Sequence, residues 1–375
     1  MTKICHIISG YHRTDARVFQ RQCKSLFIGG FDVSLLTNDG EPQETIDGMV
    51  VYSCKKHFSN RLMTLFFAYQ QFKCEALEIN ADIYVLHSPE LIPLAFKLQK
   101  HGKKIVYDAH EDLPQHILEK EWIPKFFKKP LSKVVEFYMN RKLSSFDYII
   151  TPHHHVLEKL KKINKNSDLI TNFPIINNSE KHLFNEFSKR DNNICYTGTV
   201  YRYSNQECIL NALTNIEKVN YQIAGFMDEF LHNKLSKHKS FNKINYWGRI
   251  PWNELNDFYN KSIIGVVIYD YKLNLGWKRG SYGTNKLFEY MEAGLPIICT
   301  DYVLWKNIVD KYDCGIYVQP NNSIQVENAI KKLLGNKSLA YKMGQNGRNA
   351  VLSEFNWSSQ EKILLKIFNQ IKLNE

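Results

Sequence analysis

The sequence lacks long apolar runs, closely spaced cysteines and an excess of acidic residues. No apolar segment approaches the ~20 residues that a membrane-spanning helix needs, so we predict no transmembrane segment. Residues 1–8 lead directly into a strand-like run, and we expect no signal peptide. None of the eight cysteines forms a Cys-x-x-Cys pair, and several lie in apolar runs, where cysteine packs as a small hydrophobic residue. These absences favour a reducing, cytoplasmic setting.

Acidic residues are outnumbered by basic ones, which gives a formal net charge of +11. Such a charge favours an anionic partner: nucleic acid, acidic lipid headgroups or phosphorylated substrates. We find no helix-turn-helix, zinc or RNA-recognition signature, and therefore predict no nucleic-acid binding. The cysteines offer no nucleophile–base pattern. His153-His154-His155 cannot converge on one ion, because consecutive helical residues point in different directions; we interpret them as a solvated helix start and predict no metal site.

Strand-like and helix-like segments alternate along almost the whole chain, with the first long helix at about residues 14–28. This alternation predicts an α/β fold of parallel sheets with right-handed crossovers. The length suggests two domains, and the alternation weakens at Thr171–Arg190, the best linker candidate. We predict two doubly wound, Rossmann-like domains over residues 1–172 and 173–355, and a final helix over 356–375. Ligands of such sheets bind beyond the carboxyl ends of the strands, here in the cleft across which the domains would face each other.

Residues 283–301 organise the expected second domain. Thr284 is a suitable N-cap, whose hydroxyl can accept a hydrogen bond from a first-turn amide. Leu287 and Met291 are four positions apart and would form the apolar stripe of a helix that lies on a sheet. Gly294 can adopt the left-handed conformation that ends such a helix, and a short apolar strand follows.

Lys286 and Glu289 share one face of this expected helix, near its N-terminus. Free amides and the helix dipole favour a phosphate there, and Lys286 adds a full positive charge. Glu289, one turn further, can accept two hydrogen bonds from the vicinal hydroxyls of a ribose. A phosphate contact followed by a diol contact indicates a nucleotide site. An exposed Lys–Glu pair on an amphipathic helix fits the spacing equally well.

Residues 285–297, Asn-Lys-Leu-Phe-Glu-Tyr-Met-Glu-Ala-Gly-Leu-Pro-Ile, resemble the nucleotide-sugar motif of bacterial retaining glycosyltransferases of family 4, which have the GT-B fold. Three more stretches resemble this family in the same order: 15–19 (Asp-Ala-Arg-Val-Phe), 87–91 (His-Ser-Pro-Glu-Leu) and 106–114 (Val-Tyr-Asp-Ala-His-Glu-Asp-Leu-Pro). The resemblance implies a UDP- or GDP-sugar donor, no bound cofactor or metal, and a glycan or polyprenyl-diphosphate-linked acceptor. It also implies bacterial surface polysaccharide assembly, such as capsule or O-antigen, and a final helix that crosses back to the first domain.

The resemblance assigns Lys286 to the leaving diphosphate as a catalytic group and Glu289 to the ribose. The expected nucleotide-sugar-binding residues are Gly198, Arg249, Thr284, Asn285, Lys286 and Glu289.

Two positions depart from the family pattern. Thr199 stands where an arginine is common, so Arg202, as a catalytic cation, or Arg249 would replace it; taken alone, each is more often a surface arginine. Ser281 stands eight positions before Glu289, where a second glutamate is common, so the contacts with the donor sugar are expected to differ.

Asp108-Ala109-His110-Glu111-Asp112 follows an apolar strand and therefore lies at a carboxyl end. Two acids beside a histidine can bind a sugar and relay charge. By resemblance, His110 is a catalytic residue near the donor sugar and the leaving phosphate, and Glu111 lies on the acceptor side. The alternative is that His110 caps the next helix, with Asp112 as the N-cap.

Three further residues of the first domain are acceptor-side candidates. Asp15 and Arg17 open the first helix, where they form either a local ion pair or acceptor contacts. His87 also stands at a strand end and is the third candidate.

Basic and aromatic residues mix strongly in Lys120–Lys142. This segment fits the surface of an anionic membrane, which would place the protein at the inner face of the cell membrane. Ordinary helix packing with snorkelling lysines is the alternative.

The resemblance also leaves two other functions open. One is a sugar-nucleotide epimerase of the same architecture, which would act on the donor without an acceptor. The other is a catalytically silent nucleotide-sugar-binding subunit, which the Ser281 departure allows.

Overall fold

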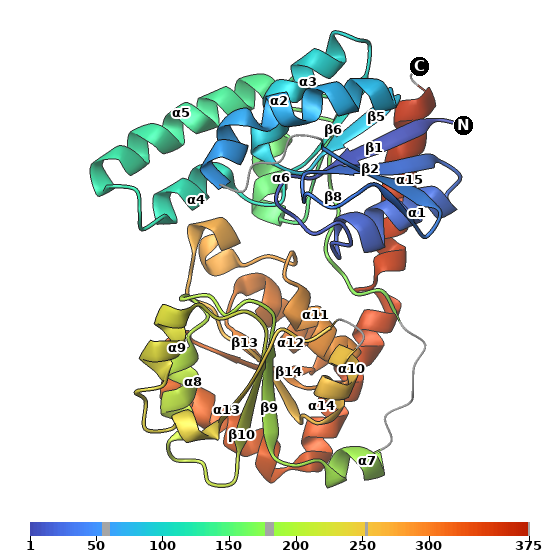
Figure 1. The fold of residues 1–375 in the computed structure, drawn as a ribbon. Coiled ribbons are helices and arrows are strands. Elements are labelled where there is room, and N and C mark those ends of the chain that lie inside the picture. The colour runs from blue at the N-terminus through green and yellow to red at the C-terminus, as the bar shows by residue number, and fades with distance from the viewer. Residues whose placement is uncertain (55–60, 177–183, 252–253, 374–375) are drawn as a thin grey trace. The chain divides into compact units, whose positions relative to one another are not determined.

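The computed structural model describes residues 1–54, 61–176, 184–251 and 254–373. The chain divides into two compact units, which are described separately (Figure 1). Unit 1 comprises Met1–Asn172 and Trp357–Glu375, and unit 2 comprises Phe173–Asn356. Each unit contains one sheet covered by helices, as the alternating pattern predicts.

The sheet of unit 1 has eight strands in the order β3-β4-β2-β1-β5-β6-β7-β8. All neighbours are parallel except β3 and β4, a short antiparallel pair that the alternation did not predict. The strands are β1 (Lys3–Ile7), β2 (Asp32–Thr37), β3 (Glu44–Ile46), β4 (Met49–Ser53), β5 (Ile83–Leu86), β6 (Lys104–Asp108), β7 (Tyr148–Thr151) and β8 (Ser167–Leu169).

The helices of unit 1 cover this sheet and include the last helix of the chain. They are η1 (Val18–Cys23), α1 (Lys24–Ile28), α2 (Arg61–Ile79), η2 (Pro89–Leu91), α3 (Ile92–Gln99), α4 (Leu113–Glu119), α5 (Lys125–Leu143), α6 (His154–Leu160) and α15 (Trp357–Leu373).

The C-terminal helix α15 packs on unit 1. The Trp357 indole donates to the Ser25 hydroxyl over 2.8 Å, and the Gln360 side chain accepts a 2.9 Å hydrogen bond from the Thr171 amide. The ring of Phe368 meets that of Phe31 edge-on, with centroids 6.3 Å apart. Residues 173–356 lie between the two parts of unit 1 in the sequence.

The expected helix at 14–28 begins only at Val18, and its first part is a π-helical segment. The Asp15 carboxylate accepts hydrogen bonds from the amides of Arg17 and Val18, while its carbonyl accepts from both Phe19 and Gln20. Because one carbonyl serves two successive amides, the first turn widens beyond the α-helical spacing. The expected helix start at Thr14 is therefore wrong by four residues.

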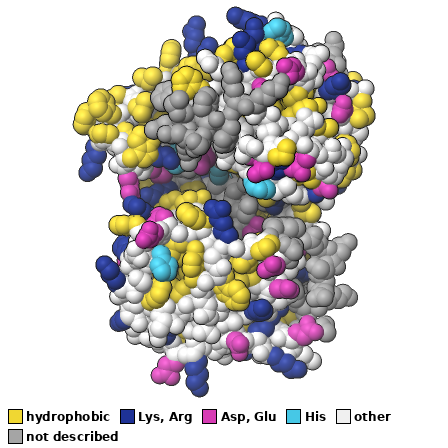
Figure 2. Space-filling model, viewed as in Figure 1, with side chains coloured by type: hydrophobic (Ala, Val, Ile, Leu, Met, Phe, Trp, Pro, Cys, Tyr) yellow, Lys and Arg dark blue, Asp and Glu magenta, His cyan; other side chains and the backbone are white. Residues whose placement is uncertain are grey.

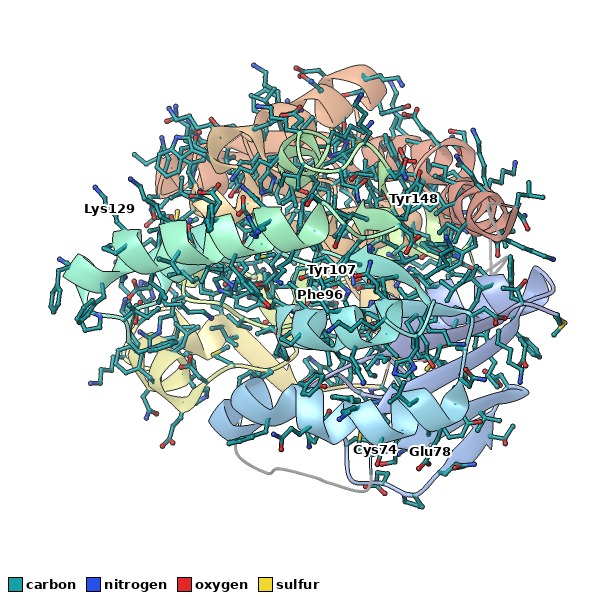
Figure 3. The ribbon with its side chains drawn as sticks, turned by 90° about the horizontal axis from the view of Figure 1, so that it is seen from above. Cys74, Glu78, Phe96, Tyr107, Lys129 and Tyr148 are labelled. Carbon is teal, nitrogen blue, oxygen red and sulfur yellow. The ribbon has the colours of Figure 1, made fainter. Side chains whose placement is uncertain are left out.

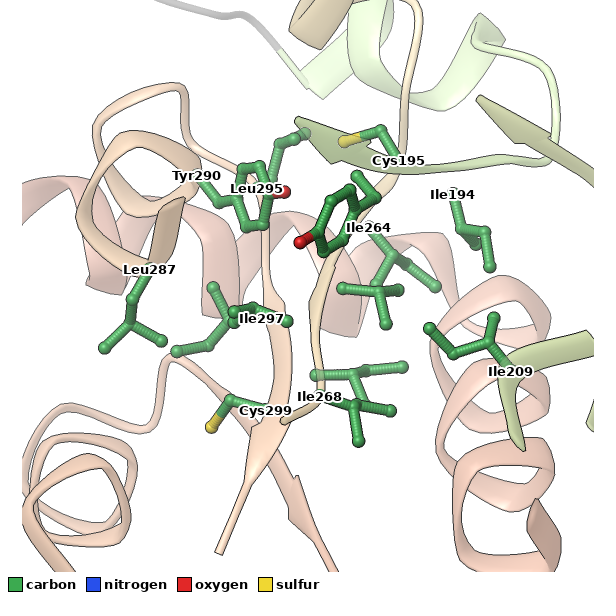
Figure 4. Packing of buried hydrophobic residues seen from close by; sticks show 14 of the residues in the cluster. Ile194, Cys195, Ile209, Ile264, Ile268, Leu287, Tyr290, Leu295, Ile297 and Cys299 are labelled. Atoms are coloured by element: carbon green, nitrogen blue, oxygen red, sulfur yellow. The ribbon is translucent and has the colours of Figure 1, made fainter. Parts of the chain in front are cut away.

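The sheet of unit 2 has six parallel strands in the order β11-β10-β9-β12-β13-β14. Its central strands are buried on both faces, which explains their continuous apolar sequences. Figure 4 shows the side chains that fill the space between these strands and the neighbouring helices. The strands are β9 (Asn193–Thr197), β10 (Asn220–Ala224), β11 (Ile244–Gly248), β12 (Ile264–Val267), β13 (Ile297–Thr300) and β14 (Gly315–Val318).

The helices of unit 2 lie on the two faces of this sheet, and α12 was not predicted from the sequence. They are α7 (Phe184–Lys189), α8 (Gln206–Leu213), α9 (Glu229–Leu235), η3 (Phe241–Lys243), α10 (Leu255–Asn260), η5 (Leu273–Leu275), η6 (Trp277–Arg279), α11 (Asn285–Glu292), α12 (Val303–Tyr312), α13 (Ser323–Gly335) and α14 (Lys337–Ser353).

The expected linker at Thr171–Arg190 is only partly irregular. It contains the boundary between the units, and it ends in the helix α7. Residues 177–183 of this prediction lie outside the described residues, as do residues 252 and 253 of the helix expected before β12. No helix in the described ranges combines the length and the apolar character that a membrane span needs.

Candidate functional site

The N-terminus of α11 in unit 2 has the features expected of an anion site. Thr284 occupies the N-cap position with an extended backbone, but its hydroxyl makes no capping hydrogen bond, so that part of the prediction is wrong. The first-turn amides of α11 thus have no side-chain cap at this position. The positive end of the helix dipole lies at the same helix start. The Asn285 Oδ1 atom is buried and has no hydrogen-bond partner among the described residues.

Lys286 lies in the first turn of α11, beside the loop that follows β9. Its Nζ atom is 5.1 Å from the ring centroid of Tyr196 and 5.9 Å from that of Tyr269. A Cβ atom added to Gly198 would be only 3.1 Å from this Nζ, so lysine and glycine are in direct contact. No described carboxylate forms an ion pair with Lys286. The structure therefore brings Lys286 and Gly198 together and leaves the ammonium group available to an anion.

Glu289 follows one turn later, and Tyr259 of α10 orients its carboxylate. The Tyr259 hydroxyl donates to Glu289 Oε2 over 3.3 Å and also lies 3.1 Å from the Thr197 hydroxyl at the end of β9. Burial, reinforced by the negative charge of Glu289, raises the pKa of Tyr259 well above its usual value. The phenol stays neutral and acts as a donor to the carboxylate. Glu289 is half-buried and fixed, rather than turned out into solvent.

Helix α11 is held in this place by its apolar face. Leu287 and Met291 are buried, as predicted, and Tyr290 also lies in the core. The Tyr290 hydroxyl accepts a 2.9 Å hydrogen bond from the Thr197 amide, which ties the helix to the end of β9. Gly294 adopts the predicted left-handed conformation after the helix, with φ of +70°.

Two glycines let the loops after β9 and β10 pass close to each other. Gly198 has φ of +82°, and its amide donates to the Ala224 carbonyl over 2.7 Å. Gly225 has φ of +147°, and a Cβ atom there would lie 2.0 Å from the Gly198 carbonyl oxygen. A side chain at Gly225 would therefore displace the backbone that contacts Lys286.

The substitution Gly225→Ala is expected to destabilise unit 2 by about 1–3 kcal/mol or more, since the clash is with backbone and not with a flexible side chain. Urea unfolding measures this change. The matched control is Gly335→Ala, where an added Cβ meets no atom within 4 Å and stability is expected to stay within about 0.5 kcal/mol. Equal stabilities for the two variants would contradict the close approach of the loops.

The remaining predicted residues of unit 2 lie in other surroundings. The Arg202 guanidinium lies 4.6 Å from the ring centroid of Phe230, in a polar cavity of about 260 Å³, and that of Arg249 lies 5.2 Å from the ring of Phe226. Both arginines are exposed, and their roles as diphosphate contacts stay predictions. Ser281 is buried; its hydroxyl accepts from the Gly283 amide over 3.0 Å, and its carbonyl accepts from a tryptophan indole.

In unit 1, the carboxylate of Asp108 at the end of β6 is the centre of a buried polar cluster. Arg17 donates to both oxygens, from Nε over 2.9 Å and from NH2 over 2.7 Å. The other terminal nitrogen of Arg17 donates to the Ile170 carbonyl and to Asn172. Burial alone would raise the pKa of Asp108, but Arg17 and the neighbouring histidines hold it well below its usual value.

This geometry overturns the alternative of a local Asp15–Arg17 ion pair. The guanidinium of Arg17 contacts Asp108, 91 positions away, while the Asp15 carboxylate accepts hydrogen bonds from the amides of Arg17 and Val18. The assignment of Asp15 and Arg17 to the acceptor side stays a prediction. The four hydrogen bonds of the Arg17 side chain, all within unit 1, account for its buried position.

His87 and His110 both contact the same carboxylate oxygen of Asp108. His87 Nδ1 and His110 Nε2 are each 3.2 Å from Asp108 Oδ2, and 3.1 Å from each other. Behind them, His87 Nε2 lies 2.9 Å from Nδ1 of His6 in β1. His87 is fully buried, whereas the side chain of His110 keeps 15 % of its surface exposed. Of the three, His110 is thus the one that a ligand can reach.

The residues that follow His110 also differ in part from expectation. Asp112 is the N-cap of α4 and accepts a hydrogen bond from Gln115, as the alternative interpretation required, but His110 itself does not cap this helix. Glu111 contacts His116 over 2.5 Å; burial would raise its pKa, but this contact keeps the pKa below the usual value. The predicted helix start after His153 is confirmed, but His153 is buried and not solvated.

Comparisons with known proteins agree with this architecture. Residues 177–350 match the family Glycosyl transferases group 1. The chain is 23 % identical, over 87 % of its length and 76 % of the other protein, to an uncharacterized glycosyltransferase of Methanocaldococcus jannaschii. It also resembles the structure of sucrose-phosphate synthase from Thermosynechococcus elongatus, with a TM-score of 0.77, 15 % identity and complete coverage of both chains. The chain is a glycosyltransferase with the GT-B fold.

A second similar structure carries a ligand. Anabaena HepE, solved in complex with UDP-glucose, resembles this glycosyltransferase with a TM-score of 0.70 and 12 % identity, over 99 % of this chain and all of the other.

Sequence reasoning missed several residues that support the predicted ones in the glycosyltransferase. Tyr259 orients Glu289, while His6 and Gln22 complete the cluster around Asp108. The signal for His6 was present, because a titratable residue in an otherwise apolar buried strand needs a polar partner. Tyr259 gave no signal, since an aromatic residue at helical spacing is the ordinary pattern of a core position.

Within the described ranges, one group of side chains in the glycosyltransferase could converge on a metal ion, namely His87, Asp108 and His110. Arg17 already binds both oxygens of Asp108, so a divalent cation there would lie beside a buried guanidinium. The cluster is better explained as a hydrogen-bonded group than as a ligand set. The expectation that the enzyme needs no metal stays a prediction.

The buried histidines predict that acid destabilises unit 1. Burial lowers the pKa of His153 to about 3 from 6.5, and it also lowers the pKa values of His6 and His87. Below pH 6.5 the unfolded chain therefore binds more protons than the folded one, and stability falls with pH by about 1.4 kcal/mol per unit for each such histidine. Urea midpoints at pH 7.5, 6.5 and 5.5 measure this loss.

The variant His153→Gln should reduce this pH dependence by the share of one histidine, because His6 and His87 remain, whereas His101→Gln, at an exposed position, should leave it unchanged. A stability that stays constant between pH 7.5 and 5.5 would contradict the burial of neutral histidines.

Proposed function

We propose that the protein is a retaining glycosyltransferase that moves a sugar from a nucleotide-diphosphate donor to a glycan or lipid-linked acceptor in bacterial surface polysaccharide assembly. The start of α11 carries this proposal. Lys286 has no ion-pair partner there among the described carboxylates, the Asn285 Oδ1 atom is buried without a partner among the described residues, and Tyr259 orients Glu289. A cation and open amides suit a diphosphate, and a fixed carboxylate one turn later suits a ribose.

The proposed chemistry places charge stabilisation at the leaving group. As the sugar bond breaks, negative charge develops on the diphosphate, and Lys286 with the α11 amides stabilises it. The acceptor attacks from the face that the leaving group departs from, through an oxocarbenium-like state, and a diphosphate oxygen helps to take the proton. This scheme needs no protein nucleophile. The UDP-glucose complex of the similar HepE protein supports a nucleotide-sugar donor.

We further propose that α5 and the segment before it rest on an anionic membrane surface. Packing within unit 1 leaves several large apolar side chains here in solvent, among them Trp122 (75 % exposed), Phe126 (72 %) and Phe137 (70 %). Figure 2 shows hydrophobic side chains gathered where α4 and α5 lie, and Figure 3 shows Lys129 near the outer end of α5. Exposed aromatic rings beside lysines are typical of an interfacial helix. Such contact would place the enzyme at the inner face of the cell membrane.

The triple change of Lys125, Lys129 and Lys133 to Gln should weaken binding to anionic vesicles roughly a hundredfold, at about 1 kcal/mol per lysine. Vesicle sedimentation measures this change. The matched control, Lys237, Lys239 and Lys332 to Gln, removes the same charge from exposed positions of unit 2. Equal losses of vesicle binding in both triple variants would mean that only the net charge of the protein matters. No loss of binding in the first variant would contradict membrane contact through α5.

Incubation with a panel of nucleotide sugars, with and without membrane lipid extract, tests the function as a whole. Transfer that requires the extract supports the proposal. An epimerised donor without extract would instead indicate the sugar-nucleotide epimerase, and donor binding without turnover would indicate the silent subunit. The anomeric configuration of the product, read by NMR, decides whether the enzyme retains or inverts.

A further inference from the structure

A cavity of about 290 Å³ lies between helices α4, α5 and α6 of unit 1. Its floor is apolar, with each of four side chains at most 8 % exposed: Met139 and Leu143 of α5, and Val156 and Leu160 of α6. Native cores leave few voids larger than a water molecule. The volume is instead close to that of the smaller ligand-binding pockets, about 300 Å³. Core packing alone therefore does not account for this cavity.

The polar side chains of the cavity lie at its rim. Glu136 is half-buried there, and Asn140 and Lys162 are exposed. The only buried polar side chain in the described lining is that of Asp112, which already pairs with Lys159 over 2.6 Å. A polar group placed on the floor would thus find no side chain to bind it, and burial without a partner costs free energy. The interior of the cavity suits a hydrocarbon.

Two neighbours of the cavity indicate which hydrocarbon it takes. Glu111 lines the cavity and directly follows His110, the histidine that a ligand can reach. Asn140 lines it from α5 and comes three positions after Phe137, so these two side chains are neighbours on the helix surface. Phe137 is 70 % exposed and belongs to the proposed membrane surface. The cavity thus lies next to a candidate acceptor residue and next to the proposed membrane contact.

We propose that this cavity binds the hydrocarbon chain of a lipid-linked acceptor, with the polar end of that lipid towards Glu111. This inference rests on the proposed function, since it takes the acceptor of the transfer to be a lipid. The cavity volume is roughly ten times the ~30 Å³ that one water molecule occupies in the liquid, and a methylene group is of similar size, so a chain of about eight to ten carbons fits. The rest of a longer chain would stay outside, in the membrane.

Methyl NMR of methionine-labelled protein without any nucleotide sugar provides the first test. The chain has seven methionines, and Met139, the only one in the described lining, is assigned from the spectrum of Met139→Leu. Hexyl, octyl and decyl maltoside, each below its micelle concentration, are expected to shift the Met139 signal, whereas maltose is not. Affinity should rise about fourfold for each added CH₂ group, the effect of burying one methylene, and level off at about ten carbons.

Three results of this titration would overturn the proposal. The first is a Met139 signal that stays unchanged with all three alkyl maltosides, and the second is an equal shift with maltose. The third is tighter binding of phenyl maltoside than of octyl maltoside, which would indicate a planar ring as the occupant instead of a lipid chain. All three are read from the wild-type protein, so they do not depend on whether any cavity variant folds.

The substitution Val156→Phe tests whether the chain enters the cavity itself. Val156 lines the cavity and is 5 % exposed, so a larger side chain there would occupy the empty space. Binding of octyl maltoside should fall more than about tenfold, the loss of two buried methylenes. The urea midpoint should not fall, because the added atoms fill a void instead of straining a packed core. The matched control, Val303→Phe at an exposed position of unit 2, should bind as wild type. Unchanged binding in folded Val156→Phe would overturn the proposal.

Transfer kinetics separate this inference from the proposed function, once a donor and a lipid acceptor have been found. Val156→Phe should raise the KM of the lipid acceptor more than about tenfold. It should leave kcat and the KM of the donor within about twofold, since the chain is bound equally in the ground state and the transition state. An unchanged acceptor KM would overturn the inference and leave the transferase standing. Alkyl maltoside binding in a protein that transfers no sugar would contradict the proposed function and leave the hydrocarbon site standing.

Discussion

The change Arg17→Met is expected to lower the free energy of unfolding by about 3–5 kcal/mol, the usual result of removing one partner from a buried ion pair. Arg17 and Asp108 are both buried and joined by two hydrogen bonds of 2.9 and 2.7 Å. Methionine fills much of the same volume but leaves the carboxylate without its cation. Asp108 must then stay charged in a poorly solvating environment or take up a proton, and either outcome costs stability.

Urea unfolding at pH 7 measures this loss, and Arg13→Met serves as the matched control. Arg13 is also buried and pairs with Asp39 and Glu44, but the acids keep 19 % and 47 % of their side-chain surface exposed, so water can solvate them after the change. The control should lose clearly less stability. The double variant Arg17→Met with Asp108→Asn should recover part of the loss, because no lone charge is left. A double variant that is no more stable than Arg17→Met would contradict the ion-pair explanation.

The sequence predicted the fold and the α11 region well, because both depend on short-range patterns. Strand and helix lengths follow from apolar periodicity, and Leu287, Met291 and Gly294 all lie within one helix and its end. The spacing of Lys286 and Glu289 alone places them on one face near the helix start. Contacts of this kind span a few residues, so local rules suffice.

The polar cluster of unit 1 could not be predicted in the same way. Arg17 and Asp108 come from elements 91 positions apart, and His6 and His87 meet only because β1 and β5 are neighbours in the sheet. Sequence spacing offers a nearby acid, Asp15, as the partner of Arg17, but the carboxylate of Asp15 accepts from the backbone amides of Arg17 and Val18 instead. The partner of Arg17 is therefore decided by which strands lie next to each other in the sheet. Apolar periodicity predicts the strands but not their order.

The loop before α11 shows a second limit. Thr284 has the residue type of an N-cap and the backbone of one, yet its hydroxyl makes no capping bond. Residue preference reports the average over many helices, whereas this helix start forgoes the stabilisation of a side-chain cap and keeps its amides open, as an anion site requires. A departure from the local rule is thus itself informative at this position.

The change Lys286→Ala is expected to lower kcat/KM for the nucleotide sugar roughly 10²–10³-fold, the size of effect that follows the loss of one charge-stabilising donor at a leaving group. The lysine ammonium lies in contact with Gly198 and beside two tyrosine rings, where water solvates it less than on an open surface. Steady-state kinetics with the identified donor measure the loss. The matched control is Lys306→Ala, since Lys306 is an exposed lysine of unit 2 whose Nζ lies 5.0 Å from the ring of Tyr317.

Calorimetric binding separates Lys286 from Glu289. Lys286→Ala should weaken binding of the nucleoside diphosphate but leave binding of the nucleoside unchanged, because only the former carries the anion. Glu289→Gln should weaken both by about 1.5–3 kcal/mol, the value of hydrogen bonds to a charged group, and should have little effect on a 2′,3′-dideoxy analogue. If Lys286→Ala weakened the nucleoside as much as the diphosphate, its charge would not act on phosphate. If the change instead left binding of both ligands unaltered, the nucleotide would bind somewhere other than the start of α11.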